Sequence, residues 1–488
     1  MGMESLPLEK GLKVGALGFM SSVVIGVAST APGYSVAASL GVVAASVATQ
    51  SPAILWIAFL PMLCIAASYY SMNRVDPDCG TTFSWVTRSM GPWAGWIAGW
   101  ALLVADLLIM ASLGQIAGKY TFRLFGAEGL AHSTFWVTVA SVAWVVAMTW
   151  ICYVGIEVSA RTQWFLLAAE IAVLGVFAAV ALARVYAGQF ADSMLPSLSW
   201  LNPFALDATA LNAGVLAAVF IYWGWDTAVA VNEETEQAAH TPGHAAILST
   251  FLLLGIYLLV AIAAQSVHGP QFLADNRDDV LSALGGAVLP FGLDKLLIIA
   301  VLTSASAATQ TTILPATRSM LSMAAHGAAP RAMGAISPRY LTPGVSTLWM
   351  GGVSIAWCVA LSLVSQDVIE DSVTATGLAI SFYLALTGLA CAIYFRRALL
   401  GDLRTFVLAG LLPLAGFASL GYVFVRSCVD LADPAKSESH SAWLGIGLPL
   451  AIGILSLVTG VALMFLMWRA DPTFFRRRLE AASPATRL

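Results

Sequence analysis

Residues 21–34 read SSVVIGVASTAPGY, an apolar run that a Pro-Gly pair interrupts at Pro32 and Gly33. Proline removes one backbone donor and clashes with the preceding turn, and glycine adds freedom to unwind. Exposed backbone at membrane depth is tolerated only where it lines a cavity or is buried in protein. The pair therefore predicts a membrane helix that breaks at its centre, beside a cavity.

A second apolar segment carries its own interruption, because residues 222–227 read YWGWDT. Gly224 lies between two tryptophans, and a carboxylate follows near the middle of the segment. Interrupted helices at matching places of two halves are the best sequence sign of an inverted-repeat transporter with a midplane site. Two ordinary kinked helices are the alternative, and the spacing of five spans between the breaks favours the transporter.

The composition requires a membrane. Of the 488 residues, 59% are hydrophobic and only 10% are charged, whereas a soluble domain carries about 25% charged residues. The net charge of −4 gives no reason to expect a nucleic-acid partner. The six cysteines show no CxxC or Cys/His spacing, so neither a disulfide framework nor a metal site is expected. The sequence contains no paired acid/base motif of the kind that would indicate an enzyme.

About twelve segments reach the roughly 20 apolar residues that a membrane span needs. They are residues 14–40, 52–72, 92–117, 134–154, 160–186, 210–232, 245–267, 292–323, 344–364, 373–395, 404–425 and 444–468. The joins near 188–209, 268–291 and 429–442 leave room for small extramembrane pieces. The predicted fold is thus an all-α polytopic membrane protein.

The expected organisation is a five-plus-five inverted repeat with discontinuous helices 1 and 6. The first repeat covers residues 14–186, the second covers 187–395, and two C-terminal helices lie within 396–468. An even number of spans places the tails 1–13 and 469–488 on one side. Most of the 23 Lys and Arg residues fall on that side, so both tails are expected to be cytoplasmic. No cleavable signal peptide is expected, and the chain is predicted to be multi-pass in the cytoplasmic membrane, with its oligomeric state left open.

The broken ends of span 1 suit a carboxylate. The second half of this span presents backbone N–H groups and the positive end of a helix dipole. We expect a substrate carboxylate to contact the amides of Ser29, Thr30, Ala31 and Gly33, since Pro32 has none.

The break in span 6 suits an ammonium group, because free carbonyls are expected near Ile221, Tyr222 and Trp223. Phe220 and Trp225 join Tyr222 and Trp223 in an aromatic cluster around this break. Such rings could gate the site or stack over a cationic substrate.

Three carboxylates fall inside predicted spans, namely Asp106, Glu170 and Asp226. A charge at mid-bilayer costs at least a few kcal/mol, and no Lys or Arg lies inside a predicted span away from its ends as an obvious partner. The neutral form is therefore favoured, which makes all three candidates for a proton carrier. Glu170 and Asp226 are the preferred candidates, whereas Asp106 has no helix break nearby and is assigned to structure first.

Structural alternatives exist for the preferred carboxylates. Asp226 could accept backbone N–H groups freed by the break, and Glu170 could bond to hydroxyls such as Ser304 or Ser306 of span 8. The two serines are expected to hold helices together. The alternative is that Ser304 and Ser306 complete a cation site with carbonyls of span 1.

Three motifs resemble the amino acid–polyamine–organocation superfamily of permeases. The first is residues 220–226, followed by residues 232–234 and Pro242. The second is PDCGTTF at residues 77–83 with residues 91–93, and the third spans residues 316–330. The resemblance covers essentially the whole chain and implies the inverted-repeat fold. It also implies that Phe220 is the gating aromatic and that Asp226 is the family's span 6 acid.

The chain departs from the family pattern at three places. Glu170 falls where many members place a lysine that stands in for a sodium ion, so the lysine-based coupling scheme does not carry over. Residues 29–33 replace a Gly-Ser-Gly-like break, and His240 stands where members often carry a basic residue after an Asn-Pro pair.

The sequence therefore predicts a secondary transporter for a small molecule, an amino acid or a related amine or polyamine. We expect proton-coupled uptake by alternating access without a bound cofactor, with sodium as the alternative coupling ion. Exchange of one amine for another is the main alternative function, and a nutrient sensor or channel on this fold is less favoured. The aromatic site favours neutral or aromatic side chains over dications.

Overall fold

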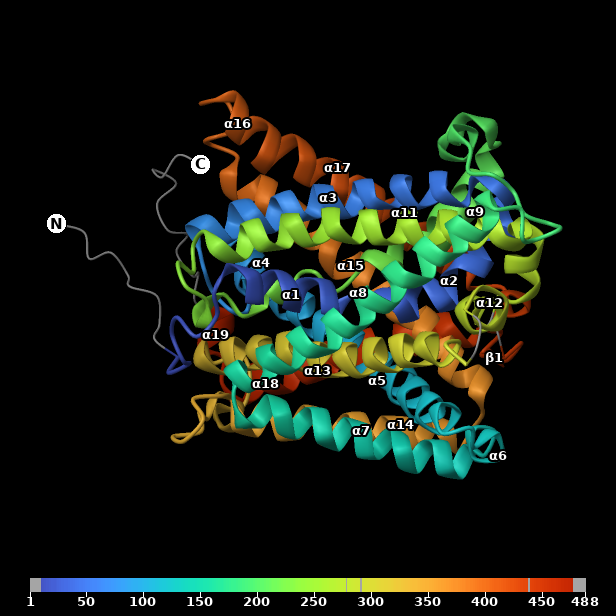
Figure 1. Ribbon diagram of the computed structural model, residues 1–488. Helices are drawn as coiled ribbons and strands as arrows, with labels where there is room; N and C mark the ends of the chain where they lie inside the picture. The colour runs from blue at the N-terminus through green and yellow to red at the C-terminus, as the bar shows by residue number, and fades with distance from the viewer. Residues whose placement is uncertain (1–9, 278, 290–291, 438, 477–488) are drawn as a thin grey trace.

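The computed structural model describes residues 10–277, 279–289, 292–437 and 439–476 as an almost entirely helical bundle (Figure 1). Its helices are α1 (Phe19–Ser29), α2 (Pro32–Val47), η1 (Ala48–Gln50), α3 (Ser51–Val75), α4 (Thr82–Met90), α5 (Pro92–Leu124), α6 (Glu128–Ala131), α7 (Thr134–Val154), α8 (Ile156–Tyr186), η2 (Leu198–Leu201), η3 (Pro203–Ala205), α9 (Ala208–Ala218), η4 (Val219–Tyr222), α10 (Thr227–Ala230), η5 (Asn232–Glu234), α11 (Thr241–Asp275), α12 (Val280–Val288), α13 (Lys295–Ala325), η6 (Arg331–Gly334), α14 (Gly344–Ser362), α15 (Gln366–Phe395), α16 (Leu403–Thr405), η7 (Phe406–Leu411), α17 (Leu412–Asp430), η8 (Pro434–Lys436), α18 (Leu448–Ala470) and α19 (Thr473–Arg476).

Among the described residues, eleven helical stretches are long and apolar enough to cross a membrane. The first of them, Phe19–Val75, has 57 residues. That is more than twice the roughly 20 residues of one crossing, and the chain reverses direction between α2 and α3 (Figure 1). Residues 19–75 therefore cross twice, which gives about twelve crossings. The predicted all-α polytopic fold is confirmed.

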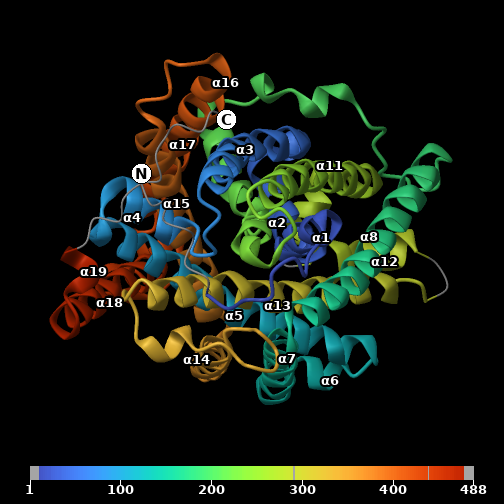
Figure 2. The same ribbon diagram turned by 90° about the vertical axis from the view of Figure 1, so that its left-hand side faces the viewer.

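The two halves of the first span lie at the centre of the bundle. Viewed along the bundle, α1 and α2 are surrounded by α3, α8, α11 and α13 (Figure 2). Both halves contact α11 and α13, and α13 packs along α5 on its other side. A broken helix is thereby shielded from lipid, as its unpaired backbone groups require.

The extramembrane pieces are small and lie where the sequence leaves room for them. The join before α9 forms η2 and η3, and the join after α11 forms α12. Within α11 the backbone kinks at Gly269, where φ is +74°, just before Pro270. Ahead of α18, strands β1 (Ala442–Trp443) and β2 (Ile446–Gly447) pair in an antiparallel hairpin.

Both ends of the described chain lie at the same end of the bundle. Near the C-terminus, the ring of Phe474 stacks on Phe83 with their centroids 5.7 Å apart. Near the N-terminus, Lys10 contacts Asp78, five residues before Phe83 along the chain. We call this end of the bundle the terminal face.

Candidate functional site

The first span breaks between α1 and α2. The amides of Thr30 and Ala31 donate back to Val27 and Ala28 carbonyls at 3.2 and 3.1 Å, which closes the end of α1. Ala31 then takes a left-handed conformation, with φ +48°, and Pro32 begins α2. Proline suits this first helical position because its fixed φ matches a helix and its missing N–H has no partner to lose. The break lies where the sequence predicts it.

The sixth span breaks after η4. Trp223 is extended, and Gly224 has φ +122°, a conformation that L side chains rarely adopt. A Cβ atom at Gly224 would lie 2.5 Å from the carbonyl oxygen of Ser29. The hydroxyls of Ser29 and Thr227 are hydrogen-bonded at 2.8 Å. The two predicted breaks are therefore in direct contact with each other.

A small cavity lies where the breaks meet. Its size suits about one water molecule or one ammonium group. It is lined by Ser29, Leu102, Asp106, Trp223, Gly224, Asp226, Thr227, Thr312, Pro315 and Tyr383. No Lys or Arg is among these lining residues.

Asp226 is held by phenol groups from other helices. Its Oδ2 accepts hydrogen bonds from Tyr383 at 2.9 Å and from Tyr69 at 3.5 Å. The Tyr383 oxygen in turn accepts the indole N–H of Trp223 at 2.6 Å. This chain fixes the carboxylate against the cavity. Sequence reasoning missed Tyr383, because one tyrosine in an apolar helix carries no local signal.

Asp106 lines the same cavity as Asp226, although it comes from α5, which is unbroken. Its side chain is buried, and its Oδ2 has no hydrogen-bond partner among the described residues. The sequence assigns Asp106 first to a structural role. Its position here instead makes it a candidate for direct contact with a ligand.

Glu170 lies at the N-terminus of α2. Its Oε1 accepts the amide of Gly33 at 2.6 Å, while its Oε2 is buried without a partner in the described structure. The next amide, that of Tyr34, donates to the hydroxyl of Ser304 at 3.1 Å. Glu170 and Ser304 thus occupy the anion-binding end of α2. Ser306 is also buried, and its hydroxyl has no partner among the residues described.

Seven of the nine predicted substrate-binding residues do not line the cavity. The Ile221 carbonyl accepts the Tyr257 hydroxyl at 2.6 Å. Tyr222 donates to the Leu55 carbonyl at 2.9 Å. The remaining aromatic groups pack elsewhere: Phe220 lies against Gly377, and Trp225 lies edge-on to Tyr69. Among the predicted substrate-binding residues, Ser29 and Trp223 are the two that line it.

Comparison with known proteins identifies the family. The amino acid permease family model matches residues 14–467. The chain belongs to the amino acid permease family. An uncharacterized transporter of Mycobacterium tuberculosis is 27% identical over 91% of this permease and 92% of its own length. The low-affinity putrescine importer PlaP of Escherichia coli is 21% identical over 84% of this chain and 87% of its own length. The branched-chain amino acid permease BcaP of Lactococcus lactis is 22% identical over 62% of this chain and 67% of its own length.

A buried ion pair joins two segments of the permease at the terminal face. Arg318 of α13 donates two hydrogen bonds to Glu234 of η5, at 2.9 and 3.0 Å, and both side chains are fully buried. Removing one partner of such a pair costs about 3–5 kcal/mol, because the other charge is left buried and uncompensated. The pair ties the segment that follows the sixth-span break to α13.

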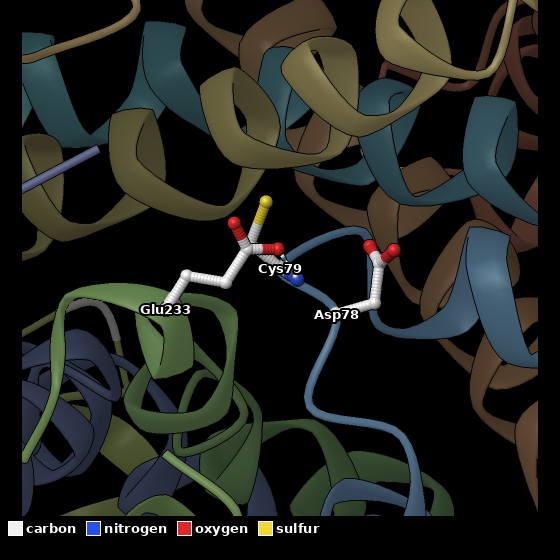
Figure 3. Close-up of side chains that lie close together, drawn as sticks. All are labelled: Asp78, Cys79 and Glu233. Atoms are coloured by element: carbon white, nitrogen blue, oxygen red, sulfur yellow. Dashed lines mark hydrogen bonds between the residues drawn. The ribbon is translucent and has the colours of Figure 1, made fainter. Parts of the chain in front are cut away.

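A second ion cluster lies beside this pair. Figure 3 shows Glu233 facing Asp78 and Cys79, which lie on the loop after α3. The Lys10 ammonium lies 3.1 Å from Asp78 and 2.5 Å from Glu233. Ligand atoms of Asp78, Cys79 and Glu233 lie within 4.8 Å of one another, a spacing that could hold a metal ion. The Lys10 ammonium contacts both carboxylates, and the Arg88 guanidinium lies 3.6 Å from Asp78.

The electrostatics keep Asp78 and Lys10 charged at neutral pH. Burial alone would raise the pKa of Asp78, but the ammonium of Lys10 holds it well below its usual range. Burial opposes the charge on Lys10, yet Asp78 and Glu233 raise its pKa above that of an ordinary lysine. The N-terminal segment is thereby fixed across the terminal face.

Replacing Gly224 tests the contact between the breaks. We expect Gly224→Ala to lower transport by about tenfold or more, because its backbone conformation and the contact with Ser29 would store about 1–3 kcal/mol of strain. Initial uptake rates in proteoliposomes measure this. Gly255→Ala is the control, since Gly255 is helical and has open space around it. Equal activity of the two variants would contradict the assigned geometry.

The Lys10 cluster predicts how closed the terminal face is. Cys79 is fully buried, and burial raises the pKa of its thiol, so it should react slowly with maleimide. Lys10→Ala should speed labelling of the Cys79 peptide severalfold, read by mass spectrometry. Lys13→Ala removes a more exposed ion pair with Glu157 and should change nothing. Labelling of Cys79 at the same rate in both variants would show that Lys10 does not hold this face closed.

Proposed function

We propose that this permease is a secondary active transporter that carries an amino acid or a related amine by alternating access. The observation that carries the proposal is the contact between two broken helices at a cavity deep in the bundle, with buried ion pairs at the terminal face. Relatives support the substrate range, since their names include a branched-chain amino acid permease and a putrescine importer.

Protons are the proposed energy source. Glu170 places one carboxylate oxygen on the Gly33 amide and leaves the other buried without a partner. An ionised carboxylate is stabilised by the positive end of α2, and a protonated one is stabilised less. Loading and unloading a proton at Glu170 would therefore change how firmly α2 is held at the break. Asp226 borders the cavity itself and is the proposed second coupling group.

The proposed orientation places the terminal face in the cytoplasm, in a cytoplasmic membrane. The excess of Lys and Arg on that side supports it through the positive-inside rule. In this orientation the permease is closed toward the cytoplasm, and uptake requires the Arg318–Glu234 pair and the Lys10 cluster to separate.

Uptake into proteoliposomes tests the function. With an imposed inward proton gradient, the permease should accumulate a radiolabelled amino acid or amine, and a protonophore should abolish accumulation. Accumulation driven by a sodium gradient alone would show that sodium, and not the proton, is the coupling ion. A strict requirement for internal substrate would show that the protein is an exchanger. One relative, a putative arginine/ornithine antiporter of Escherichia coli, carries exchange in its name and is 24% identical over 340 residues. No transport of any amino acid or amine would refute the proposal.

The Glu170→Gln variant should uncouple uptake from pH. The amide can still accept the Gly33 N–H but carries no titrating proton, so the rise in uptake at acidic external pH should flatten. Initial rates over a series of external pH values measure this. Glu157→Gln in the same helix α8 is the control, because its side chain is more than half exposed. A pH profile that matches the unmodified protein would remove Glu170 from proton coupling.

A further inference from the structure

The cavity where the breaks meet is rich in carboxylates and poor in cations. We propose that the transported molecule is an organic amine without a carboxylate, whose ammonium group binds between Asp106 and Asp226. This inference rests on the proposed transport function and narrows its substrate class.

Charge is the first argument. Asp106 and Asp226 line one cavity, and no Lys or Arg lines it with them. Asp226 has phenol donors, but the buried Oδ2 of Asp106 has no donor among the described residues. An ionised carboxylate without a partner is costly at membrane depth. An ammonium group supplies three donors and a positive charge, which is what the two side chains lack.

The second argument is the filled end of α2. A substrate carboxylate would need free amides there, as the sequence predicts. Instead, Gly33 donates to Glu170 and Tyr34 donates to Ser304. The amides of Thr30 and Ala31 donate back to α1. Glu170 therefore supplies, from within the protein, the carboxylate that an amino acid would bring, and a second anion would be repelled.

The shape of the cavity is the third argument. It has room for about one ammonium group and is bordered by Trp223, whose indole N–H is turned to Tyr383. An indole beside a desolvated cation adds a cation–π attraction. The sequence predicts an apolar, aromatic site with few carboxylates and so favours neutral or aromatic side chains over dications. Two carboxylates at one cavity favour a ligand with net positive charge.

Matched ligand pairs test the inference on the intact, purified permease. The probes are 3-methylbutylamine against leucine, and 1,4-diaminobutane against ornithine, because each pair differs by one carboxylate. We expect the amine of each pair to bind about tenfold more tightly or better, as measured by thermal shift and by competition for uptake. Tighter or equal binding of the amino acid in both pairs would overturn the inference.

Variants locate the ammonium group. Asp106→Asn should weaken amine binding by about tenfold or more, and Asp192→Asn, in an exposed loop, should leave it unchanged. Asp106→Glu keeps the charge and should retain part of the affinity, which separates lost recognition from lost folding. Glu170→Ala frees the Gly33 amide and should improve binding of the carboxylated member of each pair.

The outcomes separate this inference from the proposed function. Proton-driven leucine uptake without amine binding would support the proposed transport function and refute the inference that the substrate is an amine. Unchanged amine affinity in Asp106→Asn, with a shifted pH dependence of uptake, would mean that Asp106 holds a proton and would also refute the inference. Absence of transport for every amine and amino acid would refute the function itself.

Discussion

The architecture depends on satisfying backbone groups at membrane depth. A helix broken inside a bilayer leaves N–H and C=O groups that no water can reach, and each unsatisfied group costs several kcal/mol. Here the Thr30 and Ala31 amides donate to carbonyls of α1, and the Gly33 amide donates to Glu170; the two breaks also pack against each other. Gly224 lets its backbone approach the Ser29 carbonyl, and the hydroxyls of Ser29 and Thr227 bond to each other. Surrounding helices supply the remaining partners, including the Tyr257 hydroxyl for the Ile221 carbonyl.

The three membrane carboxylates differ in their hydrogen-bond partners. Asp226 accepts phenol O–H groups, and Glu170 accepts a helix amide. Asp106 and Glu170 each keep one buried oxygen with no donor among the residues described. Of these two, Asp106 lines the cavity, so its oxygen is the one placed to gain a donor from a ligand there. The same cavity therefore brings two carboxylates together with no Lys or Arg among its lining residues.

The terminal face is mechanically connected to the site. Glu233 and Glu234 follow α10 within four residues, so the ion pairs with Lys10 and Arg318 hold the same segment that forms the sixth-span break. A shift of that segment would change the shape of the cavity and would also strain or separate these ion pairs. Their burial makes separation costly unless water enters as they part. The segment that follows the sixth-span break therefore also carries the ion pairs of the terminal face.

The sequence by itself determined the membrane environment, the number of crossings at about twelve, the family and the positions of both breaks. These follow from local signals: long apolar runs, a Pro-Gly pair and a glycine between tryptophans act on the chain where they occur. Tertiary structure alone decided which side chains meet. Asp106 and Tyr383 lie in unbroken helices far from either break in sequence, and helix packing brings them to the cavity. Glu170 was recognisable as a buried carboxylate, but its place on the Gly33 amide depends on the packing of α8 against the first span, which no local pattern encodes.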